Sequence, residues 1–149
     1  MEEHAAALAD AIEAALPGWV ERSVARVMTD WRGEVDVDVR RAAAEAGREA
    51  VADVGPRVRE LLATDIDAQR TTPLSIVRGA VRFPTAVLQA AGVPPVQRDE
   101  HQEGLFPDDV YDLAPATFAD VDPALAEIGM TWGAAKAFKH LQRHKVGNG

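Results

Sequence analysis

Three arginines in the middle of the chain have the residue type and spacing of an anion site. Arg78 and Arg82 are i,i+4 neighbours on a predicted helix, with only small residues between them on its surface. Arg70 precedes Thr72-Pro73, a predicted helix start whose free backbone N–H groups favour an anion. One interpretation is a pocket for a phosphate or a carboxylate. The other, which we expect, is that these arginines bind the acidic residues 98–127 of the same molecule, because guanidinium groups pair well with carboxylates.

Acidic side chains form a second candidate site, for a hard cation. Calcium needs six to eight oxygens from a loop of fixed spacing with a sharp-turn glycine, and the D-x-D at residues 65–67 lacks the rest of that pattern. We therefore expect a solvated acidic loop, from which Asp99, Asp108 and Asp109 would join the arginines in binding an anion or a partner. The acids of this set, with one histidine among them, are Asp65, Asp67, Asp99, Glu100, His101, Glu103, Asp108, Asp109 and Asp112.

Two histidines near the C-terminus form a third candidate. His140 and His144 make an H-x3-H pair, so both rings would lie on one side of a helix that turns every 3.6 residues. Zinc proteases use this spacing to hold a metal ion, but they place a general-base glutamate where this chain has Leu141. The sequence marks no third ligand. We therefore expect no metal and no cofactor, and interpret the pair as part of a basic helix end.

Motifs of covalent catalysis and nucleotide binding are missing from the sequence. It has no cysteine, which excludes disulfides, cysteine-ligated zinc, iron–sulfur clusters and thiol catalysis. Its two serines, Ser23 and Ser75, lie outside any G-x-S-x-G motif, and there is no P-loop and no G-x-G-x-x-G. These absences favour a protein that binds over an enzyme, although distant residues can still converge in space.

Charge is distributed unevenly along the chain, with a net of −8. Residues 1–97 carry 15 acids and 11 bases, residues 98–127 carry nine acids and one base, and residues 128–149 carry four bases and no acids. Nucleic-acid binders usually present a basic face, and anionic lipid repels an acidic surface, so we expect neither partner. No run of about 18 apolar residues and no secretory signal is visible, which favours a cytoplasmic protein.

Helical periodicity runs through most of the chain and predicts an all-α fold. The 149 residues fit one domain, and 47% hydrophobic with 27% charged residues is typical of a globular chain. We expect one irregular bundle of about five to six helices over residues 1–149, with a long proline-rich acidic loop before the C-terminal helix. Proline removes a backbone donor, so we expect a helix break at Pro17-Gly18 and a break or a kink at Gly55-Pro56. The predicted helices are residues 3–16, 19–32, 37–54, 56–64, 73–91 and 130–145, with residues 93–122 irregular. Asp122-Pro123 is expected to open the last helical region, with a break near Gly129.

Apolar stripes indicate which helix faces are buried. Val20, Val24 and Met28 recur at helical spacing, and residues 74–83 are apolar around most of their circumference, which is typical of a central helix. Trp19 lies off its helix's stripe, so it is either exposed or covered by another element. Near the C-terminus the residues at helical spacing are Met130, Ala134, Phe138 and Leu141.

Three segments resemble a known family: ATDIDAQRTTPLSIVRGAVRFPTAVLQAAGVPP (residues 63–95), FPDDVYDL (106–113) and WGAAKA (132–137). They are similar to a family of uncharacterised small proteins from high-GC Gram-positive bacteria, over about residues 60–140. The resemblance implies a bacterial source and a cytoplasmic location, and it assigns no activity, ligand or site residue.

The function predicted from these observations is a non-enzymatic helical interaction module that binds a protein partner or another copy of itself. Ala-rich helices suited to close packing and the separation of acidic from basic segments motivate it. The alternative is a protein that binds a small molecule, an anion or a metal through the arginines and the acidic loop, with enzymes included in that class.

Overall fold

Helices make up the molecule. The structure is a computed structural model that describes residues 2–96 and 109–147. Within these ranges there is no strand, and the prediction of an all-α helical bundle is confirmed. The elements are α1 (Glu2–Arg32), α2 (Val37–Ala63), η1 (Ile66–Ala68), α3 (Pro73–Arg78), η2 (Gly79–Val81), α4 (Arg82–Ala90), α5 (Phe118–Val121) and α6 (Ala124–Gly147).

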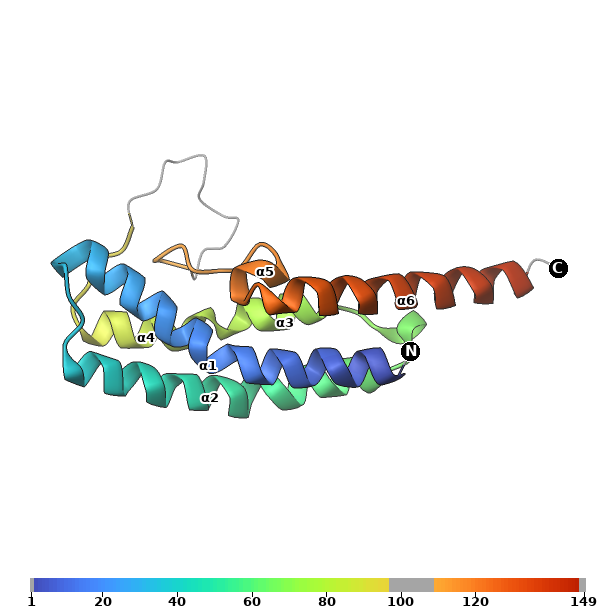
Figure 1. The fold of residues 1–149 in the computed structure, drawn as a ribbon, viewed down its shortest axis with the longest axis horizontal. Helices are drawn as coiled ribbons and strands as arrows, with labels where there is room; N and C mark the ends of the chain where they lie inside the picture. Colours follow the sequence, from blue (N-terminus) through green and yellow to red (C-terminus); the bar gives the residue numbers. More distant parts are fainter. Residues whose placement is uncertain (1, 97–108, 148–149) are drawn as a thin grey trace.

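The first two helices form a long antiparallel hairpin (Figure 1). Gly33 ends α1 with a positive φ of 79°, a conformation that glycine adopts without steric cost. Asp36 begins α2, since its side chain accepts a hydrogen bond from the backbone N–H of Val39 at 2.9 Å. Helices α3, α4 and α6 pack against this hairpin, and the end of α6 projects beyond it (Figure 1).

Proline does not break either long helix, so two of the predicted helix boundaries are wrong. Pro17 lies inside α1 and Pro56 inside α2. An interior proline costs about 3 kcal/mol or more, whereas each large aliphatic side chain taken fully out of water contributes about 1.5–3 kcal/mol. Buried apolar side chains recur every four residues on both sides of Pro17, and their burial outweighs the lost hydrogen bond. These fully buried side chains are Leu8, Ile12, Leu16, Val20 and Val24.

The segment predicted as one helix over residues 73–91 is divided into α3, η2 and α4. It starts as predicted, because the Thr72 side chain accepts a hydrogen bond from the N–H of Ser75 at 3.2 Å and Pro73 occupies the first turn. Pro84 explains the division. It has no N–H for the carbonyl of Ala80, and its ring clashes with that carbonyl in α-helical geometry, so residues 79–81 tighten into a 3-10 turn.

The C-terminal helix is longer than predicted. It begins at Ala124, directly after the predicted opening at Asp122-Pro123, and passes Gly129 without the expected break, so that it includes the residues before 130. Gly129 is needed there because a Cβ would lie 2.5 Å from Cδ2 of Phe118. Phe118 belongs to α5, a short helix inside the segment predicted to be irregular. A glycine that reads as a helix breaker is thus the place where α5 packs on α6.

Trp19 and Trp132 both contribute to the core. Trp19 is only 4% exposed and Trp132 only 7%. Trp19 is therefore covered by another element, the second of the two alternatives. None of the helices in the described ranges has an apolar stretch long enough to cross a membrane.

Candidate functional site

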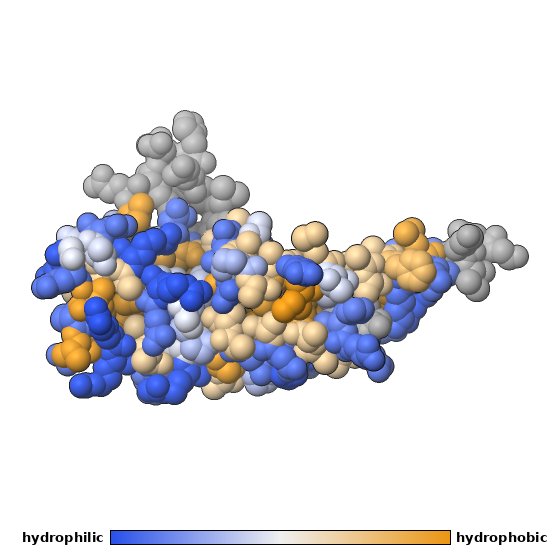
Figure 2. Space-filling model, in the orientation of Figure 1, coloured by the Kyte–Doolittle hydropathy of each residue, from blue (hydrophilic) through white to orange (hydrophobic). Residues whose placement is uncertain are grey.

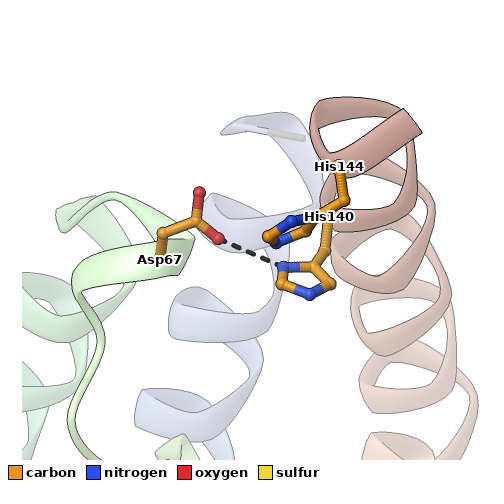
Figure 3. Close-up of side chains that lie close together, drawn as sticks. All are labelled: Asp67, His140 and His144. Atoms are coloured by element: carbon orange, nitrogen blue, oxygen red, sulfur yellow. Dashed lines mark hydrogen bonds and ion pairs between the residues drawn. The ribbon is translucent and has the colours of Figure 1, made fainter. Parts of the chain in front are cut away.

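Asp67, His140 and His144 lie together where η1 meets the far part of α6 (Figure 3). Oδ1 of Asp67 is 3.1 Å from Nδ1 of His140. The rings of His140 and His144 have centroids 4.1 Å apart. One nitrogen or oxygen from each of the three side chains lies within 4.8 Å of the others, and all three residues are exposed.

Local structure on both sides explains this meeting. The four-residue spacing of the histidines places their rings on adjacent turns of one helix face. On the other side, Asp65 caps η1 by accepting a hydrogen bond from the N–H of Asp67 at 3.0 Å. This tight turn directs the Asp67 carboxylate towards α6.

Arg143 fixes the two elements to each other. Its guanidinium donates to both oxygens of Asp65, at 2.6 and 3.0 Å, and to Oδ2 of Asp67 at 2.9 Å. Hydrogen bonds from Arg143 lower the pKa of Asp65 to about 2. Hydrogen bonds from Arg143 and then His140 also lower the pKa of Asp67. Both carboxylates therefore remain ionised, and Asp67 keeps Oδ1 turned towards the histidines.

A groove of about 450 Å³ adjoins this cluster. Its walls come from η1 on one side and from one face of α6 on the other. Lys136 stands at its edge, where its ammonium donates to Oε1 of Gln69 at 3.0 Å. The lining residues are Ile66, Asp67, Gly133, Lys136, Ala137 and His140. The groove leaves space for a small ligand beside the three polar side chains.

The three arginines singled out in the sequence have different surroundings. Arg78 donates from Nε to the carbonyl of Pro115 at 2.8 Å and from Nη2 to that of Ala116 at 3.1 Å. Arg82 pairs with Asp53 of α2 at 2.7 Å. Arg70 is exposed on the segment before α3. Arg78 thus holds the segment before α5 through backbone carbonyls.

The acids predicted to complete that site have other roles or lie outside the described residues. Asp109 is 2% exposed, and its two oxygens accept hydrogen bonds from the N–H groups of Leu113 and Ala114, each at 2.7 Å. It stabilises a turn in this way. Asp99 and Asp108 lie outside the described residues.

The outer face of α6, defined here as Met130, Ala134, Phe138 and Leu141, is exposed to solvent. Its three large side chains are 74%, 63% and 67% exposed for Met130, Phe138 and Leu141. At about 100° per residue they lie opposite Trp132, which faces the core. Figure 2 shows hydrophobic side chains near the projecting end of α6. Of the large apolar side chains that are exposed in the described ranges, only Val37 and Val96 lie elsewhere.

Asp67 is the member of the histidine cluster that the sequence did not indicate. It is 73 positions from His140. Its D-x-D context resembles part of a calcium loop, and nothing in that spacing relates it to an H-x3-H pair. Only the packing of η1 against α6 brings them together, and no periodicity or motif in the sequence specifies that contact.

Comparison with known proteins adds no assignment. No family model matches the chain, and neither a curated protein nor a solved structure matches it significantly.

Proposed function

We propose that this protein is a helical interaction module that associates through the outer face of α6, and that the partner is a second copy of the same chain. The exposure of Met130, Phe138 and Leu141 on one helix face carries this proposal. Single apolar side chains are common on protein surfaces, but three on one stripe make a continuous patch of the kind found at interaction sites.

Association would remove this patch from water. Burying one large apolar side chain contributes about 1.5–3 kcal/mol. The small side chain of Ala134 lies between the larger ones on this face, so a partner helix can approach closely. The opposite face of α6 already packs on α1 and α5, which leaves the outer face as the one for a partner.

Charge along α6 favours a second copy in antiparallel orientation. The helix has one acid, Glu127, in its first turn, whereas residues 130–144 carry three bases and no acid. In an antiparallel pair the acidic start of each helix lies beside the basic part of the other. Met130 of one copy then lies near Leu141 of the other, so the apolar faces also overlap. Such a two-fold contact is self-complementary and closes without further growth.

Molar mass measured by light scattering across a range of protein concentrations tests the proposal. We expect a monomer–dimer equilibrium for the natural chain and a monomer for the double variant Phe138→Glu/Leu141→Glu. Each side chain is used twice in a two-fold dimer, so its loss should weaken association about a hundredfold or more.

Val37→Glu is the matched control, because Val37 is 67% exposed on α2, away from the proposed contact. It should dimerise like the natural chain. A natural chain that stays monomeric at the highest concentration contradicts the proposed self-association, as does a double variant that dimerises normally. Circular dichroism establishes that each variant keeps its helices.

A further inference from the structure

We propose that Asp67, His140 and His144 bind one divalent transition-metal ion of the zinc type. This site is independent of the proposed self-association through the outer face of α6. The sequence marks only two of the three ligands, and the packing of η1 on α6 supplies the third.

The donor set suits such an ion. Two imidazole nitrogens and one carboxylate oxygen are the ligands that zinc takes in open, three-residue sites, with a fourth position left for water or another ligand. Tetrahedral ligands at about 2.0–2.1 Å from zinc lie about 3.3 Å from one another. One ligand atom from each of the three side chains lies within 4.8 Å of the others, and Asp67 Oδ1 is already 3.1 Å from His140 Nδ1. Small rotations of exposed side chains complete the approach.

The surrounding charges permit a cation despite the nearby guanidinium. Arg143 is matched by Asp65, both of whose oxygens it contacts, which leaves the negative charge of the second carboxylate, Asp67, for the ion. The positive charge of Lys139 also lowers the pKa of Asp65. Because Arg143 contacts only Oδ2 of Asp67, Oδ1 can bind a metal while Arg143 continues to orient the carboxylate. Hydrogen bonds of this kind to ligating groups stabilise metal sites.

Position gives this site a consequence for the fold. The ion would join η1 to the part of α6 that projects beyond the hairpin (Figure 1). The fourth coordination position would be free for water or for a small ligand from the adjoining groove. At about 100° per residue, His140 and His144 lie to one side of the outer face of α6, so metal binding and self-association use different parts of the helix.

Titration calorimetry with zinc chloride, on metal-free protein that carries no histidine tag, measures the binding. We expect one zinc ion per chain, and a cobalt(II) derivative with the visible absorption of a tetrahedral site. Zinc binding should weaken by about tenfold or more in each of three variants, His140→Ala, His144→Ala and Asp67→Asn. Removing a residue that only orients a metal ligand already costs about that much, and removing a ligand should cost at least as much. His4→Ala, on α1, is the matched control and should bind as the natural chain does.

Three results overturn the proposal: no zinc binding at millimolar zinc, equal binding by all variants, or unchanged binding by Asp67→Asn. The last would mean that a histidine pair alone captures the ion. Phe138→Glu/Leu141→Glu separates this proposal from the preceding one, since the monomeric variant should still bind one zinc per chain. Because one chain provides all three ligands, zinc should also leave the molar mass of the natural protein unchanged.

Discussion

Helices α1 and α6 carry similar apolar stripes and have opposite surroundings. Leu8, Leu16 and Val24 of α1 are completely buried, because α2, α4 and α6 surround that helix. The stripe that contains Phe138 and Leu141 on α6 is more than half exposed, since α1, α5 and η1 contact only its other side. A periodic stripe therefore shows that a helix has an apolar face. Whether this chain covers that face or leaves it for a partner depends on the tertiary arrangement.

Truncating one leucine from each stripe should give the largest contrast. Leu16→Ala removes a fully buried side chain and should lower the free energy of unfolding by about 2–5 kcal/mol, through lost burial and the cavity that remains. Leu141→Ala removes a side chain that is 67% exposed and should change it by no more than about 0.5 kcal/mol in the monomer. Urea unfolding at low protein concentration measures both. Similar losses for the two variants would show that the outer face of α6 is covered within the monomer.

The part of the fold that the sequence predicts is local. Thr72-Pro73 was identified from residue type as a helix start and has that role, and the helix predicted to begin at residue 37 does begin there, after its cap Asp36. Such signals work because cap geometry depends on one or two neighbouring residues. The all-α class follows in the same way, since helical periodicity recurs in segment after segment.

The boundaries that were missed depend on packing. Pro17 and Gly129 read as breaks because proline and glycine disfavour helices locally. In the structure, burial on both sides of Pro17 keeps α1 continuous, and Phe118 packs where Gly129 has no side chain. For Pro17 the sequence did contain a signal, namely apolar residues that recur every four positions on both sides of it, from Leu8 to Val24. For Phe118 on Gly129 it contained none.

Site prediction was limited for the same reason. The sequence marked His140 and His144 by spacing alone, and Asp67 could join them only once η1 and α6 were placed. For the arginines, an internal attachment to the acidic segment was expected. Arg78 reaches that segment through the backbone carbonyls of Pro115 and Ala116. Because every residue has a backbone carbonyl, no pattern of charged residues in the sequence indicates these contacts.

One glycine substitution made in each region should have opposite effects. Gly47 of α2 faces α1, and a Cβ there would lie 3.0 Å from Cα and 3.2 Å from the carbonyl oxygen of Pro17. Backbone cannot move aside easily, so Gly47→Ala should cost about 1–3 kcal/mol in strain, partly offset by about 1 kcal/mol of helix propensity. At Gly133 of α6 a Cβ would meet no atom within 4 Å, so Gly133→Ala should stabilise by about 0.5–1 kcal/mol. Thermal unfolding compares them, and a stabilised Gly47→Ala would mean that α1 and α2 are less tightly packed than described.

The smallest expected difference between the α1–α2 hairpin and the end of α6 is in how acid changes their stability. Arg59 joins α2 to α1 by donating from Nε to Oε1 of Glu13 at 2.7 Å, and this hydrogen bond lowers the pKa of Glu13 below 4.5. Arg143 joins α6 to η1 and lowers the pKa of Asp65 from 3.8 to about 2. Both groups are more acidic in the folded chain. Their stabilisation is therefore complete above the unfolded pKa values, and it is lost as the pH falls through the folded ones.

The expected loss begins below about pH 4.5 for Glu13 and extends from pH 3.8 to about pH 2 for Asp65. Solvent screens both clusters, so each effect is modest. Arg59→Gln should reduce the acid dependence of global unfolding, because it removes the hydrogen bond that lowers the pKa of Glu13. This hydrogen bond joins two helices that form the core. Arg143→Gln should leave global unfolding nearly unchanged and instead speed amide hydrogen exchange near the end of α6, a segment attached at one side only. If Arg143→Gln destabilised the whole molecule as much as Arg59→Gln, the end of α6 would belong to the cooperative core, and the contrast between the two helices would fail.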